Sequence, residues 1–499
     1  MGSIIQNSSI RLEKYTVGII LTASLVLRWI LVLRGGQYYF SDEGRYETSR
    51  NVVKLLLQGS LPEALSQVFI APEHLGFKII GILPALIENI TTQSFIIPGL
   101  FFSLFSVINL YIIYMISMKS GAGQRESLYA LFVASICMSL LYFARHLMPY
   151  DPAMTFGLLA IYSTMDKKAA AKASLGSGAL GLLCFITYNG YWTLAAAAML
   201  LHLVSQQKSI VSLLRSGAWT AAGFIAPAVG LFTLAMLAGT NLLAEYRSFS
   251  TTVSQGDFAE GWSLPFEYFW HTEHFIFVAL LVLSIFALFK VKENKRTVLM
   301  WAGTALCIYV CLLVFSVFLH SFVVYGRLAR QVIPFLILPA ASGLSELAHT
   351  FPSGQKFVQV ILAGIVLQAA WNYKASYDLT YPRDFAWEAQ TRYPEFEFSE
   401  KRLAFGAPTL CQNNGYIAEY VKRFDVPPIQ QNPPIVGQIL LAAPHPDTFL
   451  PYQYEGYTNE QRTYLRRLEP ETRLYKAADD FMSGTNPIWT TMKNCRVNE

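Results

Sequence analysis

Charged residues are scarce in this chain. Asp, Glu, Lys and Arg make up 14% of its 499 residues, whereas soluble domains carry about 25%. Hydrophobic residues make up 53%, and the mean hydropathy is +0.36. This balance excludes an ordinary soluble domain and predicts an all-α polytopic membrane bundle. The net charge of +5 comes from short basic loops and not from a basic stripe, so nucleic acid is not an expected partner.

Several motifs are also missing. The sequence contains no CxxC or HExxH spacing, no internal repeat and no low-complexity tract. No small-residue cleavage site follows the first apolar run, which is too long for a signal peptide, so we expect a retained signal anchor. Four of the six cysteines lie in apolar runs and are expected to pack as small hydrophobic residues. Cys411 and Cys495 lie in a polar tail, where an oxidising compartment would allow them to pair.

Long apolar runs predict the membrane-spanning helices. Eleven segments of suitable length are expected to span, near residues 15–34, 95–118, 127–145, 150–165, 174–189, 190–206, 217–240, 275–291, 297–320, 327–347 and 357–372. Residues 75–90 are apolar but short, contain Lys78 and Pro84, and end close to Glu88. We expect that segment to lie in the membrane surface.

Lys and Arg are concentrated in alternate connections, which predicts the orientation. The positive-inside rule places the N-terminus in the cytoplasm and residues 35–94 and 241–274 outside a multi-pass plasma (cell inner) membrane protein. Residues 1–372 then form the transmembrane domain. Residues 373–499 mix prolines, aromatics and charges, and are expected to form a small C-terminal α/β extracytoplasmic domain.

Ionisable residues gather on the face predicted to be outside. Asp42 and Arg45 follow the first span in SDEGRYETSRN, Asp151 stands in ARHLMPYDPAM, and Arg327 and Arg330 stand in VVYGRLARQVIPF. Each has an ordinary explanation, since an Asp before Pro caps a helix and Arg at a span end snorkels. Together on one face they indicate a site for an anionic substrate, because a guanidinium can donate two parallel hydrogen bonds to phosphate.

Two further stretches contain residue types that bind metals. APEHLGFKII places Glu73, His74 and Lys78 in the first outer loop, and FWHTEHF places His271 and Glu273 before the eighth span. Glu and His are common ligands, so a divalent metal ion held between the two outer loops is one hypothesis. The alternative is that these are polar residues of the membrane interface.

Six motifs, in order, resemble those of the GT-C glycosyltransferases over residues 10–372. The nearest branch is that of the protein O-mannosyltransferases and the lipid A aminoarabinose transferase. The matching stretches are SDEGRYETSRN, PEHLGFKII, ARHLMPYDPAMTFGLLAIY, GLLCFITYNGYWTLAAAAML, FWHTEHFIF and YGRLARQVIPFLILPA. Two stretches depart from the family pattern: Glu73-His74-Leu75 replaces His-Pro-Pro or Glu-Lys-Pro, and Thr187-Tyr188-Asn189-Gly190 lacks the Lys of a Thr-Lys-Gly stretch.

This resemblance implies a glycosyltransferase that uses a polyprenyl-phosphate-linked sugar. The sugar would pass, with inversion, to a lipid, glycan or protein acceptor on the outer face of the membrane. In this family's terms Asp42 is the general base or the carboxylate that orients the acceptor, and Asp151 is its supporting partner.

Basic side chains would stabilise the negative charge of the departing phosphate. The residues that the resemblance assigns to the donor phosphate are Arg45, Arg327, Arg330 and His74. Glu73 with His271 would hold a divalent metal, and no other cofactor is expected.

Two other classes of protein also fit some of these features. A secondary transporter of an anionic or sugar-like solute would keep charges near a membrane cavity, but it predicts internal repeats and paired broken helices, which the sequence lacks. A non-catalytic scaffold of the cell envelope would make the pairing of Asp42 with Asp151 accidental.

Overall fold

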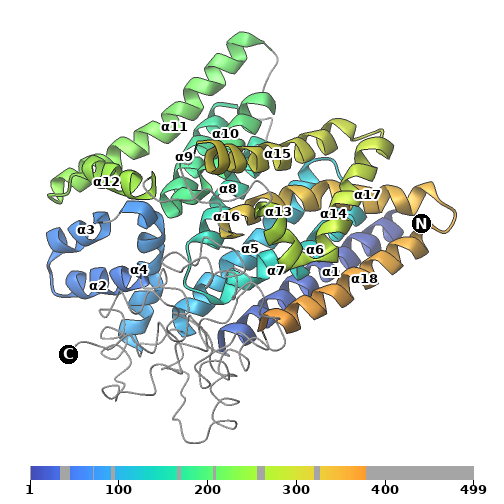
Figure 1. Ribbon diagram of the computed structural model, residues 1–499, viewed down its shortest axis with the longest axis horizontal. Helices are drawn as coiled ribbons and strands as arrows, with labels where there is room; N and C mark the ends of the chain where they lie inside the picture. Colours follow the sequence, from blue (N-terminus) through green and yellow to red (C-terminus); the bar gives the residue numbers. More distant parts are fainter. Residues whose placement is uncertain are drawn as a thin grey trace, which may run out of the picture.

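The computed structural model describes residues 2–33, 45–70, 72–91, 96–165, 170–205, 209–254, 264–319 and 326–377. Within those ranges all regular structure is helical (Figure 1). Asp42 lies outside the described residues, as do the side chains of Arg327 and His271. The predicted α/β domain and the pairing of Cys411 with Cys495 also lie outside them.

The helices of the first half comprise an N-terminal helix, a group of three helices and a central group. They are α1 (Gly2–Leu33), α2 (Tyr46–Leu57), α3 (Leu61–Phe69), η2 (Pro72–His74), α4 (Leu75–Ile90), α5 (Ile96–Lys119), α6 (Gln124–Ile136), α7 (Met138–Leu141), η3 (Tyr142–Arg145), α8 (Tyr150–Thr164), α9 (Ala170–Thr187), η4 (Asn189–Tyr191) and α10 (Trp192–Ser205). Figure 1 shows α2, α3 and α4 grouped at one side of the bundle.

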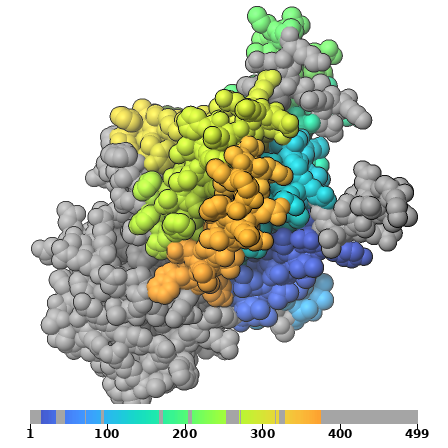
Figure 2. Space-filling view, turned by 90° about the vertical axis from the view of Figure 1, so that its right-hand side faces the viewer, coloured from blue at the N-terminus to red at the C-terminus, as the bar shows by residue number. Residues whose placement is uncertain are grey.

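The second half returns across the same bundle. Its helices are α11 (Ile210–Leu237), α12 (Leu242–Ser254), α13 (Leu264–Glu273), α14 (Phe275–Lys290), α15 (Lys295–Leu313), η5 (Val314–Phe318), α16 (Gly326–Ala329), η6 (Arg330–Val332), α17 (Ile333–Thr350) and α18 (Gly354–Tyr377). The last helix, α18, lies beside α1 in both Figure 1 and Figure 2, so the two ends of the described chain cover one flank of the bundle.

Length and hydropathy make the chain a multi-pass membrane protein. Five described helices can cross a membrane alone: Tyr15–Leu33, Ile96–Lys119, Ile210–Leu237, Lys295–Leu313 and Arg330–Thr350. Two bent pairs would raise the number to seven: Leu61–Phe69 with Pro72–Ile90, bent by 86°, and Gln124–Ile136 with Met138–Arg145, bent by 70°. Helices occupy every expected span, but the span at 127–145 is broken and several others are short, so the count of eleven stays a prediction. The helix expected at 75–90 is present as α4, and its place in the membrane surface also stays a prediction.

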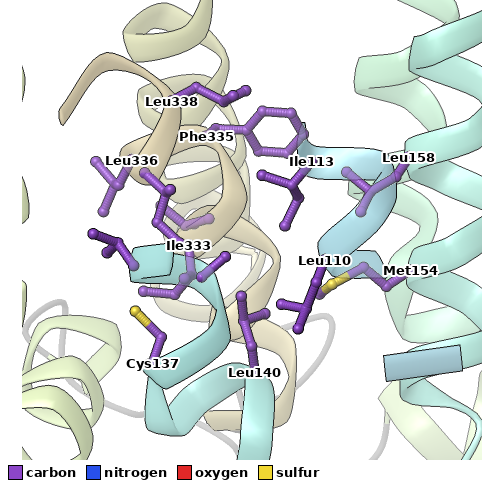
Figure 3. Packing of buried hydrophobic residues seen from close by; sticks show 14 of the residues in the cluster. Leu110, Ile113, Cys137, Leu140, Met154, Leu158, Ile333, Phe335, Leu336 and Leu338 are labelled. Atoms are coloured by element: carbon purple, nitrogen blue, oxygen red, sulfur yellow. The ribbon is translucent and has the colours of Figure 1, made fainter. Parts of the chain in front are cut away.

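The apolar core surrounds α17. Figure 3 shows Ile333 and Phe335 of this helix facing Leu110 and Ile113 of α5, with Leu140 close by. Helix α17 also packs against α6, α14, α15 and α18. Close packing of these side chains holds the central helices together, because lipid is as apolar as they are and burial alone supplies little.

Two connections that were predicted to be cytoplasmic lie at one end of the bundle. The amide of Asn294, between α14 and α15, donates to the carbonyl of Gly121, between α5 and α6, at 2.9 Å. Nearby Lys119 lies over the ring of Tyr162 at 3.9 Å. The basic connections after α5 and α14 are therefore neighbours at the same end of the bundle, while their cytoplasmic location stays a prediction.

Helix α11 is mostly exposed and is attached mainly to α9, along a line of close backbone approach (Figure 1). A Cβ at Gly178 of α9 would overlap the carbonyl oxygen of Thr220, and a Cβ at Gly223 of α11 would overlap that of Leu175. Small residues let membrane helices pack this closely. The two glycines therefore form the α9–α11 contact.

We expect Gly178→Val to separate α11 from α9 and to lower the free energy of unfolding by about 1–3 kcal/mol. Gly176→Val is the matched control, because a Cβ at Gly176 of the same helix meets no atom within 4 Å. Thermal unfolding of the purified protein in detergent measures both variants. Equal losses in the two variants would contradict the close contact.

Candidate active site

A buried ion pair joins α8 to η6. Asp151 lies in the first turn of α8, where the helix dipole favours a carboxylate, and Arg330 opens η6 just before α17. The Nη2 of Arg330 donates to Oδ1 of Asp151 at 2.6 Å, and the two side chains are 0% and 5% exposed. The sequence placed both residues on one face of the membrane, and the structure brings them into direct contact.

Neighbouring amide side chains hold both members of this pair. Asn109 of α5 donates to the backbone carbonyl of Asp151 at 3.1 Å and accepts from the hydroxyl of Thr155 at 2.7 Å. Gln331, which follows Arg330, accepts from the hydroxyl of Thr193 at 2.9 Å and is itself buried. The ion pair is therefore fixed to α5 and α10 as well as to its own elements.

A second polar pair lies in the segment predicted to form the first outer loop. Arg45 immediately precedes α2 and His74 immediately precedes α4, and Nη1 of Arg45 lies 2.7 Å from Nε2 of His74. Because a guanidinium only donates hydrogen bonds, Nε2 accepts, so His74 is neutral with its proton on Nδ1. In this arrangement His74 orients Arg45.

Charged residues on α2 and α4 keep Arg45 beside His74. Arg50 donates to both carboxylate oxygens of Glu88, at 3.0 and 2.6 Å, and to Glu47 at 2.6 Å. The hydroxyl of Tyr46 donates to Glu88 at 2.8 Å. A bidentate pair of this kind fixes orientation as well as distance, so α2 is held firmly across α4.

Aromatic rings connect the two polar pairs. The ring of His74 lies 5.3 Å from that of Tyr188, which lies 4.8 Å from that of Tyr150, between ring centroids. Tyr150 contacts Phe143 at 5.0 Å, and the guanidinium of Arg330 lies 5.2 Å from the centre of the Phe143 ring. The starts of α2 and α4, η3, the start of α8, the end of α9 and η6 therefore meet at one end of the bundle.

Arg145 and His146 belong to the same region, although the sequence reasoning did not select them. Both are buried, and Nε of Arg145 donates to Nε2 of His146 at 3.1 Å. The His146 ring lies 5.5 Å from that of Tyr142. The available signal was a basic residue followed by His at the end of an apolar run, shortly before Asp151 in ARHLMPYDPAM.

Three other residues that the sequence singled out differ in how far the structure describes them. Asp42 lies just upstream of the described Arg45. Arg327 is in α16, one turn before Arg330, and its side chain lies outside the described part. Lys78 is buried in α4, and its Nζ donates to the carbonyl of Ile70, next to the bend between α3 and α4.

The two residues proposed as metal ligands lie on elements with different neighbours. Glu73 is in η2, which packs on α4, α9 and α12, whereas His271 is in α13, which packs on α7, α14, α16 and α18. Among the described residues no group of three His, Cys, Asp or Glu side chains is arranged to hold a metal ion. The metal hypothesis therefore rests on sequence alone.

The arrangement of helices is similar to that of a known membrane protein. The crystal structure of ArnT from Cupriavidus metallidurans in the apo state matches 95% of this chain and 75% of its own, with a TM-score of 0.54 and 12% sequence identity. The chain has an ArnT-like fold. At this identity the similarity establishes the fold, and it agrees with the GT-C resemblance of the motifs. The sequence matches no protein-family profile and no curated protein sequence.

A double-mutant cycle tests the ion pair of this ArnT-like bundle. Asp151→Asn and Arg330→Met should each lower the free energy of unfolding by about 3–5 kcal/mol, because each leaves its partner buried without the opposite charge. The double variant should lose less than the sum of the two. Thermal or denaturant unfolding in detergent measures the cycle, with exposed Arg296→Met as the control. Strictly additive losses would contradict a direct pair.

Proposed function

We propose that this protein is an inverting GT-C glycosyltransferase that moves a sugar from a polyprenyl phosphate to a lipid, glycan or protein acceptor at the outer face of the membrane. The observation that carries the proposal is the convergence of Arg45 and His74 with Asp151 and Arg330 through one chain of aromatic rings. The ArnT-like fold and the order of the sequence motifs support it.

The proposed reaction is a single displacement at the anomeric carbon. An acceptor nucleophile attacks this carbon on the face opposite the phosphate, and its proton passes to the carboxylate of Asp42. The bond between the anomeric carbon and the phosphate oxygen breaks, and its electron pair leaves with the polyprenyl phosphate. Since attack and departure occur on opposite faces, the configuration inverts.

Cationic side chains at the site stabilise the charge that develops on the leaving phosphate. Arg45, at the edge of the first outer loop, is half-buried and already oriented by His74. Arg145 adds a second, fully buried guanidinium, and Arg327 is assigned to the phosphate by the motif resemblance. In this proposal Arg45, Arg145 and Arg327 share the phosphate.

The Asp151–Arg330 pair has a supporting role in this scheme. Because Arg330 donates to Asp151, it is a weaker candidate for the phosphate than Arg45, Arg327 and His74, the other residues that the resemblance assigned to it. The pair instead holds a positive and a negative charge at fixed positions beneath Tyr150 and Phe143. Fixed dipoles and charges of this kind stabilise a transition state without reorganising.

Asp42→Asn should abolish sugar transfer while the protein still folds, because an amide cannot accept the proton. Glu43→Gln, which removes the adjacent carboxylate, is the matched control and should retain transfer. Mass spectrometry of envelope lipids and glycans from a deletion strain, complemented with each variant, identifies the missing sugar. A normal sugar profile with Asp42→Asn would refute the proposed base.

Arg45→Gln should weaken binding of undecaprenyl phosphate by about tenfold to a hundredfold, the range for a lost charge-assisted hydrogen bond. Arg45→Lys should restore part of the affinity, because it keeps the charge and loses the fork. Equilibrium binding in detergent measures both, with exposed Arg296→Gln as the control. Equal affinity of Arg45→Gln and the wild type would remove Arg45 from the phosphate site.

A further inference from the structure

A short broken helix carries Arg145 into the site. Helix α7 and η3 together form Met138–Arg145, and this segment is bent by 70° from α6. A break inside a membrane bundle leaves backbone N–H and C=O groups without their usual helical partners, and hydrocarbon offers no water to replace them. The direction of Met138–Arg145 therefore depends on which groups hold the backbone where this segment begins.

The carboxylate of Glu273 accepts hydrogen bonds from the first backbone N–H groups of this segment. Glu273 is the last residue of α13, is 0% exposed, and accepts from the N–H of Met138 at 3.1 Å and from that of Ser139 at 2.6 Å. Each bond uses a different carboxylate oxygen, an arrangement suited to the ionised form. Burial raises the pKa of Glu273, and the two N–H bonds oppose that shift. Negative charge at a helix start is favourable.

A guanidinium from α1 reaches the next residue of the same short helix through a hydroxyl. Arg28 of α1 is fully buried, and its Nε donates to the hydroxyl of Ser106 at 2.8 Å. That hydroxyl donates in turn to the carbonyl of Leu140, in α7, at 3.0 Å. An Arg within a membrane span is costly to bury, so its retention calls for a specific role.

The backbone around Glu273 is itself constrained. His274, the next residue, has φ of +48°, a conformation that residues other than glycine rarely adopt. The amide of Asn372, in α18, donates to the carbonyl of Glu273 at 3.1 Å. The tight turn at His274 separates α13 from α14 and leaves the Glu273 side chain directed at α7.

We propose that Glu273 and Arg28 are positioning residues that fix the direction of Met138–Arg145 and thereby hold Arg145 and His146 at the site. The two side chains reach adjacent residues of α7, Glu273 directly at Ser139 and Arg28 through Ser106 at Leu140, from two elements that are distant in sequence. The positioning stands on these contacts alone, whereas its effect on ligand binding rests on the proposed glycosyltransferase function.

Hydrogen–deuterium exchange of the full-length protein in detergent tests the positioning. Glu273→Gln keeps the shape of the side chain but loses the charge and one acceptor. We expect exchange to rise by about tenfold or more in peptides covering residues 138–148, since bonds to a charged group are lost. The α6 peptide should stay unchanged. The control Glu293→Gln, an exposed carboxylate between α14 and α15, should alter neither peptide.

Ser106→Ala provides a second variant that retains both charges. It removes only the hydroxyl between Arg28 and Leu140, and we expect faster exchange in the 138–148 peptides here as well. Unchanged exchange in both variants would overturn the proposal. A rise spread evenly over α6 and α7 would also overturn it, because that pattern marks a general loss of stability.

Binding of undecaprenyl phosphate separates this proposal from the proposed function. Glu273→Gln should bind the probe about tenfold more weakly than the wild type, following the displacement of Arg145. Faster exchange with unchanged affinity would show that α7 does not position the site. If the wild type itself does not bind the probe, the proposed function fails, and the exchange result still decides whether Glu273 and Arg28 hold α7.

Discussion

Charge that is buried among apolar helices must be matched where it lies, and this constraint organises one end of the bundle. Three arginines, Arg28, Arg145 and Arg330, are fully buried. Arg330 meets Asp151, and Arg28 meets the hydroxyl of Ser106, in each case across two separate elements. Removing one member of a buried pair costs about 3–5 kcal/mol. The partners therefore specify which helices lie side by side, beyond what apolar packing alone determines.

The sequence predicted part of the site for a clear reason. Asp151 and Arg330 stand at the ends of apolar runs, so alternating spans placed them on one face. The pairing of side chains depends on how each helix is rotated and on which helices are its neighbours. Spacing along the chain gives neither. Glu273 illustrates the difference: its place in FWHTEHF suggested a possible metal ligand, whereas its carboxylate accepts hydrogen bonds from the backbone of α7. The sequence analysis did not select Arg28, although an ionisable residue within a membrane span is by itself a candidate functional residue.

The fold was predictable at the level of helices and less so at their breaks. Residues 127–145 read as one continuous span, yet the helix breaks at Cys137 and turns by 70°. No Gly or Pro marks this position, and the partner of the new helix start is Glu273, far away in the sequence. The close approach of α9 and α11 could not be predicted either, because glycines in the sequence permit close packing but do not show which helix packs against them. Long-range contacts decided both features.

The site combines residues of different burial. Asp151, Arg330 and Arg145 are buried in α8, η6 and η3, and Asp151 is held from several sides. Arg45 is half-buried just before α2, where its contact is with His74. In the proposed reaction a bulky lipid donor enters and leaves this site, while the geometry at the anomeric carbon tolerates little error. A half-buried guanidinium at the edge and buried charges behind it would meet both requirements, because the donor phosphate then meets a cation that solvent already reaches.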